Sequence, residues 1–148
     1  MANTKQLYIV LEMANKKEQE ELKNYSQAQQ QLTQLKQQME SLSQYKADYL
    51  GQMKPENNQE ITATKLIQLQ GFLTQIDQSI FKQRDVIASA SLIVDARKKT
   101  WGKAKQYCDS IEFLIEKQGK ELAFKEDKQQ QKLSDEFAMM SYHRKKKH

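Results

Sequence analysis

Apolar residues recur at alternating intervals of three and four almost without a break over residues 69–122. This is the heptad pattern of a coiled-coil seam, in which two positions of every seven face a partner helix. One seam set reads Leu73, Ile80, Ile87, Val94, Trp101, Cys108, Ile115 and Leu122. The other set mixes apolar and polar residues, namely Leu69, Ile76, Ala90, Ala104 and Ile111 with Gln83, Arg97 and Gln118. The pattern predicts one long helix that needs a partner.

A second heptad pattern, over residues 7–49, provides that partner within the same chain. Its two seam sets are Leu11, Tyr25, Leu32 and Met39, and Leu7, Ala14, Ala28, Leu35, Leu42 and Tyr49, interrupted by Glu18, Glu21 and Lys46. Between the two patterns lie the single proline, Pro55, and the turn formers Asn57 and Asn58. The hydroxyl of Thr62 or Thr64 can cap the helix that follows.

The sequence therefore predicts an all-α fold, a long antiparallel two-helix coiled-coil hairpin with unequal arms. We expect a single domain over residues 1–148, with helices at about 5–50 and 63–140. A loop at about 51–62 joins these helices, and a basic tail at 141–148 follows them.

Matching of size and charge across the seam predicts how the two helices pair. In an antiparallel hairpin the numbers of opposite residues add to a constant, and a constant of about 115 sets large side chains against small ones. It gives the pairs Trp101 with Ala14, Tyr25 with Ala90, Leu11 with Ala104, Met39 with Ile76, and Glu18 with Arg97. A shift of one heptad keeps the seams facing but loses these matches. A polar seam pair penalises wrong registers more than it stabilises the right one.

The second helix is expected to project beyond the first. At about 1.5 Å per residue the helices span roughly 65 Å and 115 Å, and the predicted register places Met1 opposite Leu114. The chain after Ile115 is then a single helix, which carries Leu133, Phe137 and Met140 at spacings of four and three. Such a stripe either docks into a groove or ring of a partner or belongs to a frayed amphipathic tail, and its spacing leaves both open.

Composition agrees with paired helices and no thick core. Only 38% of the 148 residues are hydrophobic, and the chain has four glycines and one proline. Cys108 is the sole cysteine, so no disulfide forms within the chain and a cytoplasmic protein is expected. The apolar run at residues 7–11 is too short for a signal peptide, and no segment is apolar enough to span a membrane.

The net charge of +5 comes mostly from the closing Arg144, Lys145, Lys146 and Lys147, flanked by His143 and His148. This cluster reads either as a solvated tail at the negative end of a helix or as a contact for an acidic partner. Acidic residues are interspersed elsewhere, so we expect no specific nucleic-acid binding. Without a glycine-rich phosphate loop, and with both histidines in the tail, we expect no metal site, no cofactor and no enzyme activity.

Aromatic residues gather near the predicted turn. Tyr45 and Tyr49 end the first helix, and Phe72 precedes the seam position Leu73 on the second. Tyr49 belongs to the seam, whereas Tyr45 and Phe72 lie beside it. Partly exposed aromatic side chains at one end of a hairpin are typical of a protein-binding hot spot, and they also occur as shields that flank a seam.

Residues 42–49 (LSQYKADY), the short loop, and residues 69–73 (LQGFL) with Ile76 and Ile80 resemble the flagellar export protein FliJ family. Residues 132–138 (KLSDEFA) with the basic tail are similar to the C-terminal close of that family. Lys98, Lys99 and Trp101 resemble its basic and tryptophan segment. The resemblance extends over nearly the whole chain, and its most specific part is the tyrosine pair with Phe72.

The resemblance implies a non-catalytic component of the flagellar type III export apparatus, peripheral at the cytoplasmic face of the basal body. It implies a stalk whose terminal end lodges in the hexameric export ATPase, whose other end reaches the membrane export gate, and which contacts export chaperones. By motif match, the gate-binding residues would be Gln38, Leu42, Tyr45, Tyr49, Phe72, Ile76, Ser79 and Gln83. From their stripe, Leu133, Phe137 and Met140 would contact the ATPase ring.

Three other functions remain open at this point. The equivalent stalk of a virulence type III secretion system would share the same architecture. A coiled-coil chaperone or holdase, as in prefoldin-like proteins, would carry β-hairpins at the base of its coils, and no alternating strand pattern occurs in this sequence. A basic nucleic-acid-binding coil is a third reading, which salt-dependent binding to DNA or RNA would reveal.

Overall fold

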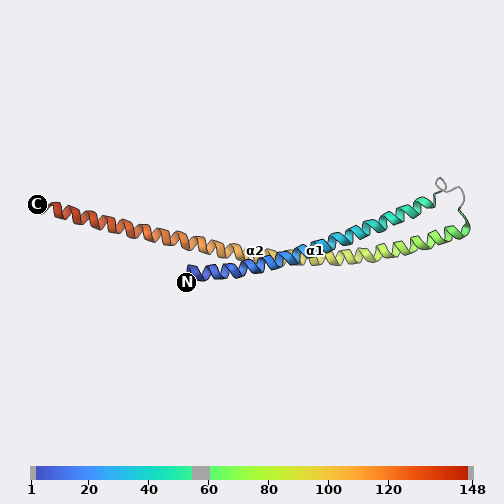
Figure 1. Cartoon of the computed structure of the whole chain (residues 1–148), viewed down its shortest axis with the longest axis horizontal. Coiled ribbons are helices and arrows are strands. Elements are labelled where there is room, and N and C mark those ends of the chain that lie inside the picture. Colours follow the sequence, from blue (N-terminus) through green and yellow to red (C-terminus); the bar gives the residue numbers. More distant parts are fainter. Residues whose placement is uncertain (1–2, 55–60, 147–148) are drawn as a thin grey trace. The chain divides into compact units, whose positions relative to one another are not determined.

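The computed structural model describes residues 3–54 and 61–146 of the chain. These residues form two helices, α1 (Thr4–Gln52) and α2 (Ala63–Lys146), and no strand occurs among them. The chain divides into two compact units, one of Met1–Glu18 with Lys103–His148 and one of Gln19–Gly102. In each unit a segment of α1 runs antiparallel to a segment of α2 (Figure 1). The predicted all-α, two-helix hairpin is confirmed.

Polar side chains satisfy the first backbone N–H groups of each helix. Asn3 caps α1, because its Oδ1 accepts a hydrogen bond from the N–H of Gln6 at 2.8 Å and its own N–H donates to Gln6 Oε1. Thr62 caps α2, because its Oγ1 accepts from the N–H of Lys65 at 3.2 Å. The sequence predicted a cap at Thr62 or Thr64, and the structure has it at Thr62. The turn residues Pro55, Asn57 and Asn58 lie outside the described residues.

The α1–α2 seam is thin in both units. In the unit of residues 19–102, Ala28 and Leu69 are buried, and the other apolar seam residues keep part of their surface in water. In the unit of residues 1–18 and 103–148, the buried residues are Leu7, Ala14, Cys108 and Ile111. Two helices can bury only one stripe each, so the fold depends on few side chains.

The predicted register is wrong by about one heptad. Contacts within each unit join Tyr49 to Phe72, Lys46 to Asp77 and Thr4 to Gln118, so opposite residues have numbers that add to about 122 rather than 115. The ring of Tyr25 packs against Trp101, at 5.8 Å between centroids, and not opposite Ala90 as predicted. An aromatic pair adds about 0.5–1.5 kcal/mol beyond the area that it buries, a contribution that matching large with small side chains does not count. The predicted Glu18–Arg97 pair was derived from the same register.

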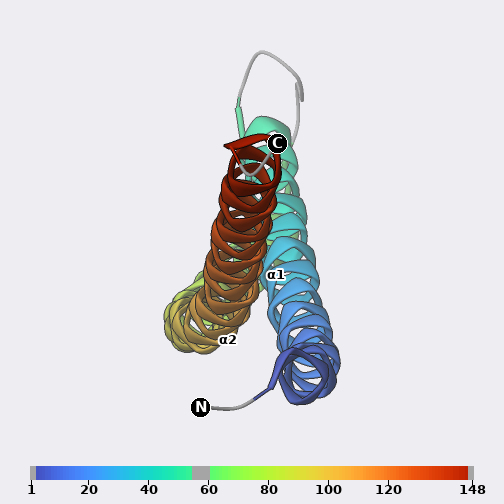
Figure 2. The ribbon, with the colours of Figure 1, turned by 90° about the vertical axis from the view of Figure 1, so that its left-hand side faces the viewer.

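The shifted register moves the start of the unpaired helix by about one turn. Thr4 Oγ1 donates to Gln118 Oε1 at 3.2 Å, so α2 is paired as far as Gln118 and not only to Ile115. All residues from 119 to 140 are exposed, and the red end of α2 has no second helix beside it in Figure 1. Figure 2 views the helices from this end. The helix continues to Lys146, past the predicted end near 140, and the predicted opposition of Met1 falls outside the described residues.

Because the core is one stripe wide, replacing a buried seam residue with alanine should lower the free energy of unfolding far more than replacing an exposed residue. Replacing Ile111, which is buried in the seam, with alanine is expected to lower the free energy of unfolding by about 2–5 kcal/mol. Leu92→Ala removes a side chain that is 71% exposed and should change it by less than about 0.5 kcal/mol. Urea denaturation followed by circular dichroism measures both, and equal losses would contradict this account of the core.

Candidate functional site

The structure brings the eight predicted gate-binding residues together in the unit of residues 19–102. They line two adjoining open hollows that share Ser79. We call this surface the aromatic groove; α1 contributes Gln38, Leu42, Tyr45 and Tyr49, and α2 contributes Phe72, Ile76, Ser79 and Gln83. The groove exists because both helices place residues at spacings of three and four on the same side of the seam.

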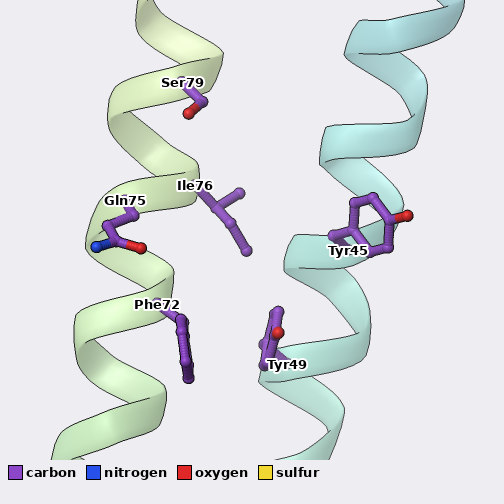
Figure 3. A pocket seen from close by; sticks show the side chains of 6 residues that line it. All are labelled: Tyr45, Tyr49, Phe72, Gln75, Ile76 and Ser79. Atoms are coloured by element: carbon purple, nitrogen blue, oxygen red, sulfur yellow. The ribbon is translucent and has the colours of Figure 1, made fainter.

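Two stacked rings form one end of the aromatic groove. Tyr49 and Phe72 lie with their centroids 5.7 Å apart and their planes 21° from parallel. Figure 3 shows these two rings facing each other across the seam, and Ile76 pointing from α2 toward α1. Tyr45 is 58% exposed and Phe72 is 48% exposed, so this end presents aromatic surface to water. Exposed aromatic clusters of this kind are typical of protein-binding sites.

An amide side chain closes the other end of the groove. Gln83 occupies a seam position, and its Nε2 donates to the backbone carbonyl of Leu35 at 3.1 Å and to Gln38 Oε1 at 3.2 Å. These hydrogen bonds satisfy a polar group that a seam would otherwise bury without a partner. Ser41 and Lys82 complete this end. The groove therefore changes from apolar and aromatic near Phe72 to polar and basic near Lys82.

The groove residues differ in how much they also support the fold. Leu42, Tyr49, Ile76 and Gln83 are half-buried in the seam, so their removal would also weaken the pairing of the helices. Tyr45, Phe72, Gln38 and Ser79 are exposed. Tyr45 and Phe72 are therefore the side chains through which recognition can be tested with the least change in stability.

Three groove residues were not predicted from the sequence, namely Ser41, Gln75 and Lys82. Each lies three residues after a predicted one, Gln38, Phe72 and Ser79 respectively, and so shares its helical face. Helical spacing alone could have found them once the face was known.

The C-terminal stripe predicted to contact an ATPase ring lies in the other unit, on the unpaired part of α2. Leu133, Phe137 and Met140 are 64%, 71% and 63% exposed and share one face of the helix. Met139 and Tyr142, which the prediction omitted, are equally exposed. The paired part of this unit contains a buried thiol, that of Cys108. Burial raises the pKa of Cys108, as do the nearby carboxylates of Glu18, Asp109 and Glu112. That environment disfavours the reactive thiolate.

Metal-binding groups and membrane-spanning helices are absent from the described residues. Among residues 3–54 and 61–146, no group of three or more histidine, cysteine or acidic side chains could hold a metal ion. No helix in that part of the chain is long and apolar enough to cross a membrane. What the described residues offer are open surfaces of aromatic rings, hydroxyls and amides, which are suited to contact with another protein.

Comparison with known proteins identifies the family. The family model described as flagellar FliJ protein matches residues 4–147, essentially the whole chain. Comparisons with curated proteins and with solved structures gave no match. The matched span includes both the aromatic groove and the C-terminal stripe, and the fold agrees with the hairpin that the resemblance implied. The chain belongs to the flagellar FliJ protein family and is a component of flagellar type III protein export.

Proposed function

We propose that the chain is a non-enzymatic stalk of the flagellar export apparatus. The C-terminal stripe engages the hexameric export ATPase, and the aromatic groove binds the membrane export gate. The chain also contacts export chaperones and works at the cytoplasmic face of the basal body. It does so by binding and transmitting mechanical force, without catalysing a reaction.

One observation supports this proposal: within the described residues, the fold leaves both of the predicted binding surfaces uncovered. The first is the aromatic groove, in which Tyr45 and Phe72 keep about half of their surface in water. The second is the stripe of Leu133, Phe137 and Met140 on a helix that has no partner after Gln118. Exposed apolar surfaces on otherwise charged helices are characteristic of sites that partner proteins cover. Two such sites on one chain suit a protein that joins two partners.

The family match favours the flagellar system over the equivalent stalk of a virulence secretion system, because the matched model is that of the flagellar protein. The chaperone alternative of the prefoldin type expects β-hairpins, and the described residues contain no strand. The stalk is therefore the function that the two surfaces support best.

Reconstitution with the export ATPase tests the proposal. The purified chain is mixed with the ATPase and ATP, and ring assembly and ATP hydrolysis are measured as the ratio of chain to ATPase increases. A stalk in the centre of a hexamer should saturate its effect near one chain per six ATPase subunits. An absence of binding and of stimulation, in a sample whose circular dichroism shows folded helices, would contradict the proposal.

A further inference from the structure

Lys46 is an unexpected residue for a seam, because it places a charge where the neighbouring seam positions are Leu42 and Tyr49. Its ammonium Nζ lies 2.8 Å from Oδ1 of Asp77 on α2, and the two side chains are 40% and 54% exposed. An ion pair with this much exposure adds little to stability. The ion pair can still favour one register of the two helices over another, because a shifted register would place a different residue of α2 beside Lys46.

The residue of α2 that would lie beside Lys46 differs in charge from one register to the next. Asp77 is the residue next to the seam position that faces Lys46, and the equivalent residues one heptad away are Gln70 and Arg84. A slip of one heptad in one direction would give Lys46 a neutral neighbour. The opposite slip would set it beside a like charge, which is unfavourable. Among these three registers, only the observed one gives Lys46 an acidic partner.

The other polar contact in this part of the seam does not discriminate in the same way. Gln83 donates to a backbone carbonyl and to Gln38, and Gln31 stands one heptad before Gln38. Backbone carbonyls repeat along any helix, so a slip that brings Gln31 to the place of Gln38 could reproduce both hydrogen bonds. Such a slip would therefore keep the hydrogen bonds of Gln83 but would separate Lys46 from Asp77.

The aromatic groove depends on the register because each helix supplies half of it. A slip of one heptad displaces the helices by about 10 Å, since seven residues rise about 1.5 Å each. Tyr49 would then leave Phe72, with which it stacks at 5.7 Å, and Gln38 would leave Gln83. Asp77 itself lines a different hollow, with Phe81, and is not part of the groove.

We propose that Lys46 and Asp77 are positioning residues that select the heptad register in which α1 and α2 assemble the aromatic groove. The part of this proposal that concerns partner binding rests on the proposed function of the groove. The part that concerns register needs no partner. Polar seam residues are known to select register at little gain in stability.

The register can be measured with two introduced cysteine pairs, both of which include Ala28→Cys. Both proteins also carry Cys108→Ala, so that no other thiol is present. Ala28→Cys with Val94→Cys joins residues that face each other in the observed register. Ala28→Cys with Ile87→Cys joins residues that would face each other after a slip toward Gln70. Neither pair lies in the groove. The equilibrium constant for disulfide formation of each pair, measured in a glutathione buffer, reports how often its two positions meet.

The decisive variant moves the acid by one heptad without changing composition, as Gln70→Asp with Asp77→Gln. The ratio of the slipped to the native disulfide constant is expected to rise about tenfold, because one ion pair is lost and another becomes available. The matched control, Gln78→Asp with Asp85→Gln, moves an acid over the same distance at exposed positions and should leave the ratio unchanged. With Lys46→Gln added, moving the acid from 77 to 70 should no longer shift the ratio.

An unchanged ratio in the decisive variant would overturn the selection of register by this pair. An equal shift in the absence of Lys46 would overturn it as well. Gate binding is judged separately with the two oxidised proteins. The native pair should bind the cytoplasmic part of the gate protein as the reduced protein does, and the slipped pair should bind only after reduction with dithiothreitol. Equal binding by both locked forms would overturn the dependence of gate binding on register, and no binding by the native pair or the reduced protein would overturn the gate as partner of the groove. In either case the disulfide ratio would still decide the role of Lys46 and Asp77.

Discussion

Replacement of Tyr45 and Phe72 together by alanine is expected to lower the affinity for the export gate by about a hundredfold or more. Both side chains belong to the aromatic groove and keep about half of their surface in water, where a partner can cover it; within the chain, Phe72→Ala also removes the stacking on Tyr49. Titration of the cytoplasmic part of the gate protein measures the affinity. Far-ultraviolet circular dichroism should keep the helix signal of the unchanged protein.

The matched control replaces a phenylalanine and a tyrosine that are also exposed by about half or more but lie outside the groove. Phe81→Ala with Tyr107→Ala removes side chains that are 69% and 53% exposed and should leave gate binding intact. If the Tyr45 and Phe72 variant lost its helix signal, these rings would be packing residues. If both double variants bound the gate normally, the groove would not be the binding surface.

The second large effect is expected at the unpaired end of α2. Alanine at Leu133, Phe137 and Met140 should abolish binding to the export ATPase in a pull-down and remove any stimulation of ATP hydrolysis. These side chains are all more than 60% exposed, so the free energy of unfolding should change by less than about 1 kcal/mol. Alanine also has a higher helix propensity than phenylalanine, which favours retention of the helix.

A control of the same size separates this stripe from general loss of apolar surface. Alanine at Phe81, Leu92 and Ile93 removes three exposed side chains from the unit of residues 19–102. ATPase binding should survive in that variant. Binding that persists in the C-terminal variant would show that the ring contact lies elsewhere on the chain.

Several features of the molecule follow from local sequence. The alternation of three and four residues predicted both helices and their antiparallel pairing, because helical geometry converts that spacing into one apolar stripe. The sequence predicted a cap at Thr62 or Thr64, because a hydroxyl there can accept a hydrogen bond from a backbone N–H that no helical carbonyl reaches. The groove residues were named from family resemblance, and helical spacing places each set of four on one face.

The register is what the sequence analysis did not predict. A heptad repeat faces its partner equally well after a shift of seven residues, so periodicity allows several registers of similar quality. Matching large with small side chains chose one of them and was wrong. The observed register joins Tyr25 to Trp101 in an aromatic contact and Lys46 to Asp77 in an ion pair, and matching large with small side chains counts neither.

The sequence by itself thus determined that this chain forms two long paired helices with an unpaired C-terminal extension, and which faces of them are apolar. Those properties depend on residues within a few turns of one another. Only the tertiary structure decided which turn of α1 meets which turn of α2, and therefore that Tyr49 stacks on Phe72. That decision is a small difference between sums of weak contacts made by residues distant in sequence, and no local pattern contains it.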